Sequence, residues 1–360
     1  MNSSSKPSSK LNLLIVVNSD SFAIFNSLFT AVQYFYENPL IGSVALLDLQ
    51  HNKKFFSDLS DLDTTLHVID PDESYAYSNF SEYKTREADA SDFDGVLMRM
   101  TAPMGYDLDA FYTKMKKLFP VPFINDLDGM LEFGSKGKLA DLQDSLVDNG
   151  VSYIPEVRNC SSAKEIHDFR QAVDSDVVIK SFYGYGGNEV FLMSYDGFCE
   201  FDDDAALDEF IQKVGGQVCV QKFIQTDRVI DDRLILLFDP EIQSMKLTCI
   251  MRRTAPQGEW RANASQGATL SFYHVDDRHE KIAKLLGPQL MEAGLYLAGI
   301  DVLYDQEQLD NEGQPLPKIT EINVRNVGGL INTSEWAGID YTRQFTDGIC
   351  WLLNERNQSA

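Results

Sequence analysis

The stretch VVIKSFYGYGGNEVF, Val177 to Phe191, decides the fold of this chain. Its two apolar ends predict buried strands joined by a glycine-rich turn. Gly184, Gly186 and Gly187 allow the backbone of this turn to approach a ligand closely, and successive free amides form a concave anion site. Lys180, at the mouth of the first strand, adds a positive charge that suits a phosphate. The alternative is an ordinary hairpin with a flexible tip, so the rest of the chain must decide.

Length and charge restrict the class of protein. The chain has 360 residues, 44% of them hydrophobic, which predicts a folded protein of two or three domains. Its formal net charge of -24 leaves no basic surplus to neutralise a polynucleotide, so we expect no nucleic-acid partner. A bound nucleotide stays open, because a local group of Lys and Arg side chains can act against the overall charge.

Cysteines and terminal segments bear on the compartment. The five cysteines are scattered and form no CxxC pair, which is typical of reduced thiols in a cytoplasmic protein rather than of disulfides or a zinc site. The first ten residues, MNSSSKPSSK, predict a disordered tail. The apolar run at 11–17 is too short to span a membrane and makes a poor signal peptide. We therefore expect no membrane partner.

The N-terminal region alternates strands and helices. Apolar runs predict a strand ending at Val17, a helix capped by Ser19 or Asp20, and a second strand at 44–49, which together make a βαβ unit. Further segments predict a polar loop at 71–92, a helix at 108–118 and three strands, at 65–69, 96–100 and 121–124. No GxGxxG or GxxxxGK[ST] motif occurs here.

The region after Asn125 predicts a second unit. The segment at 134–150 predicts a capped helix that ends at Gly150 and carries Lys136 and Lys138. Later segments predict helices at 203–214 and 280–291 and strands at 217–224, 234–238 and 245–251. A loop of little apolar content spans 252–273, and loops of that length are often lids.

Two late strands carry candidate metal ligands. The apolar stretch Leu297–Tyr304 holds one carboxylate, Asp301, and in Lys318–Val324 the side chains of Glu321 and Asn323 project from one face. If these strands pair, Asp301 joins the other two. Three oxygen ligands without His or Cys suit Mg²⁺ or Mn²⁺. The alternative is a polar sheet edge that faces solvent, but an unpaired charge in an apolar strand is costly, so we favour the metal site.

These features, taken in order, resemble the ATP-grasp ligases, and among them the prokaryotic type of glutathione synthetase. The matching segments are VLMR at 96–99, the lysine-bearing helix start at Lys138, the glycine-rich hairpin, QKFI at 221–224, DDRL at 231–234, PQGEWRAN at 256–263, and GIDV followed by TEINV. Each motif alone is modest in specificity. Their order and joint presence, over roughly residues 11 to 350, carry the resemblance.

The resemblance implies an α/β fold with α+β character in the C-terminal half. After the tail at 1–10, an N-terminal Rossmann-like pre-ATP-grasp domain would occupy 11–124, followed by a two-lobed ATP-grasp domain at 125–356. The central lobe would cover about 150–225, and the C-terminal lobe with the metal site about 226–356. It also implies a homo-oligomer, such as a tetramer.

The resemblance further implies roles for individual residues. Two lysines, a mobile glycine cover, a hinge strand beside adenine and two residues near the ribose and phosphates would bind ATP: Lys138, Lys180, Gly184, Gly186, Gly187, Gln221, Lys222, Phe223, Ile224, Asp231 and Arg233. Two magnesium ions, or manganese in their place, would be held by Asp301, Glu321 and Asn323. The phosphates and the acyl substrate would be approached by Arg253, Arg261 and Asn263. A substrate carboxylate would be held by Arg99.

The implied reaction joins an acid to an amine. A substrate carboxylate attacks the γ-phosphate of ATP, and an amine then displaces phosphate from the acyl phosphate. Cations must neutralise the repulsion between the carboxylate and the triphosphate, and a lid must exclude water. The glycine turn and the long loop are the two segments able to supply that lid. No nucleophilic side chain is required.

Departures from the glutathione synthetase pattern leave the substrates open. Arg325 and Asn326 stand where that pattern has small polar residues and proline, close to the incoming amine, although Arg325 could instead pair with surface carboxylates. Lys222 stands where an amide is expected. The spacing of the long loop is closer to the ribosomal-protein glutamate ligases. Three functions remain: glutathione synthetase, which joins γ-glutamylcysteine to glycine; a ligase for another acid and amine; and a non-catalytic ATP-binding regulatory protein.

Overall fold

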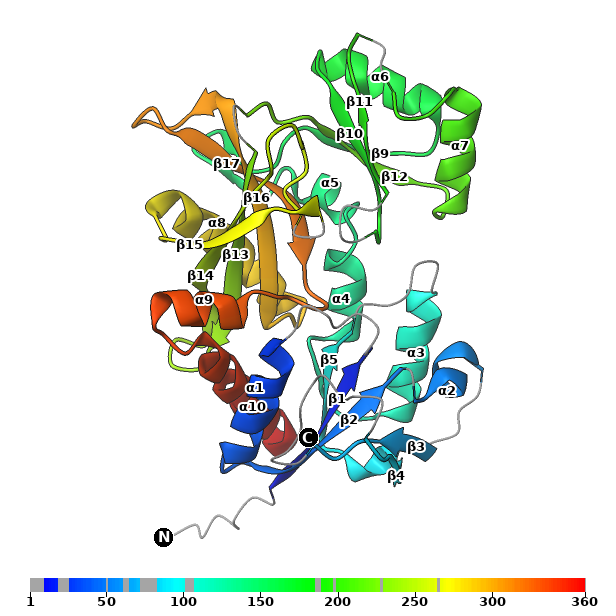
Figure 1. Ribbon diagram of the computed structural model, residues 1–360, viewed down its shortest axis with the longest axis vertical. Coiled ribbons are helices and arrows are strands. Elements are labelled where there is room, and N and C mark those ends of the chain that lie inside the picture. Colours follow the sequence, from blue (N-terminus) through cyan, green and yellow to red (C-terminus); the bar gives the residue numbers. More distant parts are fainter. Residues whose placement is uncertain are drawn as a thin grey trace.

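The computed structural model describes residues 10–18, 26–49, 51–60, 65–71, 83–100, 107–184, 189–196, 199–226, 229–263 and 266–359. The tail at 1–9 and the helix start after Ser19 lie outside these ranges. The N-terminal unit is built on a parallel four-stranded sheet of order β2-β1-β5-β6, at the bottom of Figure 1. Its strands are β1 (Leu11–Val17), β2 (Ile41–Asp48), β5 (Gly95–Arg99) and β6 (Phe123–Ile124).

Helices α1 (Asn26–Glu37), α2 (Lys53–Ser57) and α3 (Leu108–Leu118) complete this unit. The expected α/β character is confirmed, and the Rossmann-like assignment stays a prediction. The polar segment 71–92 is not all loop, because Arg86–Asp89 forms β4 and pairs antiparallel with β3 (Thr65–Val68). The strand expected at 65–69 thus exists but lies in a separate hairpin, linked to the main sheet through Leu46 and Ile69.

The central lobe contains the expected hairpin. β10 (Val177–Ser181) and β11 (Val190–Met193) pair antiparallel in a sheet of order β11-β10-β12-β9, with β9 at Val157–Cys160 and β12 at Val218–Lys222. Helices α6 (Ala163–Val173) and α7 (Asp204–Lys213) cover one face, and Asp203 caps α7 as its position predicts. These elements enclose their own hydrophobic core, so the lobe packs as a separate body.

The C-terminal lobe is an antiparallel sheet of order β15-β14-β13-β16-β17. Its strands are β13 (Ile230–Asp239), β14 (Ser244–Thr254), β15 (Thr269–Tyr273), β16 (Leu297–Leu309) and β17 (Pro315–Asn323). The prediction of one loop over 252–273 is therefore wrong in extent. Its two ends pair with each other, Arg252 opposite Ser271, so the connection shortens to 255–268.

The remaining helices join the units. α8 (Asp277–Glu292) packs on the C-terminal sheet, and α9 (Leu330–Ala337) leads to α10 (Tyr341–Ser359), which returns to lie beside α1 (Figure 1). The single helix predicted at 134–150 is wrong. The chain forms α4 (Leu127–Phe133), the short α5 (Lys138–Leu142) and a small hairpin of β7 (Val147–Asp148) and β8 (Val151–Ser152), where Gly150 adopts a φ of 81°.

No helix among the described residues is long and apolar enough to cross a membrane. All five cysteines lie in the described part of the chain and none forms a disulfide.

Candidate active site

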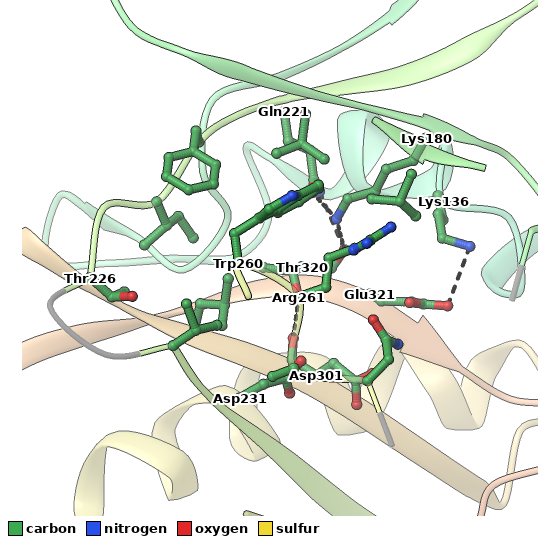
Figure 2. Close-up of a pocket in the computed structure, with 18 of the residues that line it drawn as sticks. Lys136, Lys180, Gln221, Thr226, Asp231, Trp260, Arg261, Asp301, Thr320 and Glu321 are labelled. Atoms are coloured by element: carbon green, nitrogen blue, oxygen red, sulfur yellow. Dashed lines mark hydrogen bonds and ion pairs between the residues drawn. The ribbon is translucent and has the colours of Figure 1, made fainter. Parts of the chain in front are cut away.

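A cleft separates the central lobe from the C-terminal lobe. It encloses about 880 Å³ of empty space, part of it open to solvent, and both sheets contribute side chains to it. Figure 2 shows Lys136 and Lys180 on one side and Asp231 and Asp301 on the other, with Trp260 between them. Eleven predicted site residues line this cleft: Lys180, Gly184, Gln221, Lys222, Phe223, Ile224, Asp231, Arg261, Asn263, Asp301 and Glu321.

The cationic side is formed by two lysines. Lys180 Nζ, from β10, donates to Gln221 Oε1 at 2.5 Å and to the Thr320 carbonyl at 3.2 Å. Burial lowers the pKa of Lys180, and nearby Glu321 acts in the opposite direction. Lys136 Nζ donates to the Gly184 carbonyl and lies 3.4 Å from Glu321 Oε1. Both ammonium groups therefore lie where the glycine-rich hairpin meets β17.

Lys138, the lysine predicted to contact ATP, does not line the cleft. Its ammonium pairs with Glu132 and lies 5.1 Å from the Phe133 ring centre. Lys136 occupies the cleft position, because its backbone N–H bonds to the Phe182 carbonyl and so ties the turn before α5 to the end of β10. The structure thus places Lys136, and not Lys138, in the cleft wall, and the ATP contact of Lys138 stays a prediction.

The anionic side centres on Asp301. This carboxylate is 3% exposed and accepts from Arg233 Nε at 2.7 Å and Arg233 Nη2 at 2.8 Å. Arg253 Nη2 lies 2.8 Å from Asp301 Oδ2 and donates to Asp231 Oδ1 at 2.6 Å. Burial alone would raise the pKa of Asp301, but the two guanidinium groups outweigh it and hold that pKa well below the usual value. Burial raises the pKa of Asp231, with Arg253 opposing.

The three predicted metal ligands lie together. β16 and β17 pair so that Asp301 is opposite Glu321, and Asn323 Nδ2 donates to Asp301 Oδ2 at 3.1 Å. The described residues contain no group of three or more His, Cys, Asp or Glu side chains arranged for a metal. In the cluster described here, two of the three side chains are carboxylates and the third is an amide. Two carboxylates and an amide oxygen nevertheless fit a hard divalent cation. Asp301 already accepts from Arg233, Arg253 and Asn323, so a cation bound to its oxygens would displace one of these donors.

An apolar wall closes the far end of the cleft. β12 runs into the segment Gln221–Ile224, and the Phe223 ring centre lies 6.2 Å from that of Trp260, which comes from the 255–268 connection. Lys222, which also lines the cleft, pairs with Glu307 at 3.3 Å. The ring of Trp260 thus lies against the hinge segment and forms part of the cleft wall.

The predicted arginines occupy different positions. Arg261 pairs with Glu259 at 3.0 Å and lies 5.3 Å from the Trp260 ring centre, at the cleft wall with Asn263. Three predicted site residues contact the carboxylate of Asp301 but do not line the cleft themselves: Arg233, Arg253 and Asn323.

Arg99 and Arg325 lie beyond the cleft, where the N-terminal unit meets the end of β17. Arg99 Nη2 donates to the Val327 carbonyl at 3.1 Å. Gly186 and Gly187 fall outside the described residues.

Lys136 and Thr320 are among the cleft residues that the sequence analysis did not assign to the site. Lys136 had the same local signal as Lys138, so sequence alone could not separate them. Thr320 contributes only its backbone carbonyl to Lys180, which leaves no side-chain signal.

Comparisons with known proteins agree with this geometry. The family model for the prokaryotic glutathione synthetase ATP-grasp domain matches residues 147–336. The chain is 24% identical to the glutathione synthetase of Mesorhizobium japonicum, covering 76% of this chain and 78% of that protein. It is 25% identical to that of Shewanella oneidensis, over 74% and 76% of the two chains. The crystal structure of D-cycloserine synthetase DcsG superposes with a TM-score of 0.63 at 14% identity, covering 95% and 99%.

Proposed function

The chain belongs to the prokaryotic glutathione synthetase ATP-grasp family, and from that premise we propose that it is an ATP-dependent carboxylate–amine ligase. It forms an amide bond through an acyl phosphate and releases ADP and phosphate. The first candidate substrates are γ-glutamylcysteine and glycine. The observation that carries the proposal is the cleft itself, because the ammonium groups of Lys136 and Lys180 line it together with the carboxylates of Asp301 and Glu321.

We propose that the triphosphate lies between these two sides. Lys136 and Lys180 would neutralise phosphate oxygens, while Asp301, Glu321 and Asn323 would hold divalent cations, Mg²⁺ or Mn²⁺. When bound, such ions shield the triphosphate and polarise the γ-phosphoryl group. Gly184, whose carbonyl accepts from Lys136, begins the cover over the phosphates. The close approach of Lys136 to Glu321 supports a site in which cation and anion positions are paired before the nucleotide arrives.

The nucleobase end would lie against the apolar wall. Backbone groups of the Gln221–Ile224 segment would bind the edge of the base, and the paired rings of Phe223 and Trp260 would enclose its face. Asp231, at the cleft wall, would lie near the ribose. The support for these placements is that the residues line the cleft. Substitutions of these residues should therefore change the affinity for the nucleotide.

The proposed reaction has two steps, phosphoryl transfer to the acid and then attack by the amine. A carboxylate oxygen attacks the γ-phosphorus while the bond to the β–γ bridging oxygen breaks and ADP leaves. The amine then attacks the acyl carbon, loses a proton, and expels phosphate with the bridging oxygen. Arg253 and Arg261 would offset negative charge during the first step, and Asn263 and Arg99 would orient the acid. The connection at 255–268 would close over the acyl phosphate to exclude water.

ADP release with Mg-ATP and panels of acids and amines tests the proposal. Release only with γ-glutamylcysteine plus glycine selects glutathione synthetase. Release with another pair selects a ligase of different specificity, which the departure at Arg325 favours. Tight ATP binding without substrate-dependent ADP would leave the non-catalytic regulatory alternative and refute the ligase.

The assembly and compartment complete the proposal. We propose a cytoplasmic homo-oligomer, such as a tetramer, with domains at 11–124 and 125–356 and lobes that meet near residue 225. Buried thiols agree with a reducing compartment: burial raises the pKa of Cys160 and Cys249 to about 12 each, which keeps them unreactive. Sedimentation velocity distinguishes a tetramer from a monomer.

A further inference from the structure

Arg325 is a half-buried residue whose guanidinium has no anionic partner among the described residues. Its Nε and Nη2 atoms are buried and have no hydrogen-bond partner in the described part of the chain. Five other arginines of this lobe contrast with it, because each pairs with a carboxylate at 2.6 to 3.0 Å: Arg233, Arg252, Arg253, Arg261 and Arg278. In a chain with a net charge of -24, a desolvated guanidinium with no such partner is unexpected.

The surroundings hold this guanidinium in place without neutralising it. Its central carbon lies 4.9 Å from the Tyr183 ring centre. A side chain at Gly134 would bring a Cβ within 3.0 Å of both Nε and Nη2, so the absence of a side chain there gives the guanidinium room. On the third side lies Tyr112, whose pKa is raised by burial while Arg325 acts to lower it. Two aromatic rings and a glycine orient the fork but supply no negative charge.

The position of Arg325 relates it to the reacting groups. β17 ends at Asn323, and Arg325 lies two residues further along the chain. It therefore directly follows the strand that carries Glu321 and Asn323, which lie beside Asp301. Four parts of the molecule meet there: α3 through Tyr112, α4 through Gly134, the end of β10 through Tyr183, and β17. Arg99 reaches the same segment through the Val327 carbonyl. A substrate that reacts at the γ-phosphate end of the cleft would extend toward this junction.

We propose that Arg325 binds a carboxylate of the amine substrate, so that the acceptor is an amino acid or peptide recognised by its acid group. The inference rests on the proposed ligase function and specifies its acceptor. A guanidinium and a carboxylate form two parallel charge-assisted hydrogen bonds, which would satisfy both partnerless nitrogens. A simple amine, or an acceptor whose carboxyl is an amide, would leave them unsatisfied.

Binding is measured first, by calorimetry, so that turnover is not required. The probes are glycine, alanine, glutamate and glycinamide, each titrated into full-length protein held with Mg-ADP. Wild type should bind at least one free acid and should bind glycinamide roughly 10-fold or more weakly than glycine if glycine is that acid. Arg325→Gln should lose this preference. Arg325→Lys keeps the charge but not the fork, so it should bind the acid with intermediate affinity.

Arg86→Gln is the matched control, because Arg86 pairs with Asp70 on the exposed surface of the N-terminal unit, away from this junction. Each variant's melting temperature and Mg-ADP affinity are recorded beside wild type. Equal binding of acid and amide by wild type, binding of no probe, or unchanged acid binding by a folded Arg325→Gln variant would overturn the inference.

Measurements of turnover distinguish the proposed ligase activity from the proposed carboxylate site at Arg325. With an active acid–amine pair, Arg325→Gln should raise the KM of the acceptor roughly 10-fold or more while the KM of ATP stays within about twofold. A wild type that binds the acid but never releases ADP contradicts the ligase and not the carboxylate site. An active wild type whose acceptor KM is unchanged in Arg325→Gln contradicts the carboxylate site and not the ligase.

Discussion

The two faces of the C-terminal sheet carry the same kinds of charged side chain, but these side chains form different ion pairs on each face. Consecutive residues of β13 and β14 alternate between them, so Asp231 and Arg253 face the cleft, whereas Asp232 and Arg252 face α8. On the cleft face, Arg253 is shared between two carboxylates. On the α8 face, Arg252 forms a two-point pair with Asp232, at 2.7 Å for each hydrogen bond.

The α8 face is a closed network. Tyr304 donates to Asp232, and His279 Nε2 lies 2.7 Å from the Tyr304 hydroxyl oxygen. On the other side of the ring, His279 Nδ1 lies 3.2 Å from the backbone nitrogen of Asp276 and 2.9 Å from Asp276 Oδ1. Burial and charge alone therefore do not mark a functional site. The cleft face differs because its groups border empty space and face two lysines.

The largest expected effect concerns Glu321. Glu321→Ala should lower kcat by roughly 10³-fold or more, because it removes a proposed cation ligand at the γ-phosphate end. Its side chain is only partly buried and the described ion pair is with Lys136 at 3.4 Å, so the melting temperature should stay close to wild type. Steady-state ADP release and a thermal melt measure the two quantities. An active Glu321→Ala enzyme would contradict the assigned metal role.

The converse is expected on the opposite face. Asp232→Asn leaves Arg252 without its carboxylate partner, and breaking a buried pair costs about 3–5 kcal/mol of stability. Asp232 is fully buried, so solvent cannot compensate. Urea unfolding measures the loss, and any variant that stays folded should retain ATP affinity. A stable Asp232→Asn protein that has lost ATP binding would show that the two faces are not separate in role.

The two lysines of the α5 turn make a smaller, matched test. Lys136→Ala should weaken Mg-ATP binding roughly 10-fold or more, because a charge-assisted contact to phosphate is lost. Lys138→Ala, two residues away, should change it by less than about threefold, since its ammonium pairs with Glu132. Equilibrium titration with Mg-ATP measures both. The reverse order would restore the assignment made from sequence.

The smallest effect is a pH dependence of stability. Burial lowers the pKa of His279, with Asp276 and Asp232 opposing and Arg278 and Arg252 reinforcing. The unfolded imidazole therefore takes up a proton more readily than the folded one. This contribution is fully present above the unfolded pKa of about 6.5 and is lost as pH falls toward the folded value. When the pH is lowered from 7.5 to 5.5, the melting temperature of wild type should fall further than that of His279→Gln. An equal decrease in both proteins would contradict the assigned role of His279.

Much of the site was predictable because strand geometry is local. Alternation along β17 puts Glu321 and Asn323 on one face, and pairing with β16 brings Asp301 opposite. The hinge segment Gln221–Ile224 and the glycine hairpin also lie where the motif order indicates.

Tertiary contacts decided what could not be predicted. Lys136 and Lys138 differ only through the contact of the turn with Phe182, which no local pattern encodes. The extent of the long loop was misjudged because Thr269–Tyr273 is an edge strand of mixed polarity, stabilised by pairing with β14. Among the described residues, the surroundings of Arg325 likewise come from three neighbours far apart in sequence, Tyr112, Gly134 and Tyr183.

The central claim is that a substrate carboxylate attacks the γ-phosphate in this cleft. Its most direct test uses an acid labelled with ¹⁸O in both carboxylate oxygens, incubated with Mg-ATP, the amine and the enzyme. An acyl phosphate transfers one labelled oxygen to phosphate, so mass spectrometry should find one ¹⁸O in each phosphate released with ADP. Phosphate free of label, formed together with amide product, would contradict the mechanism.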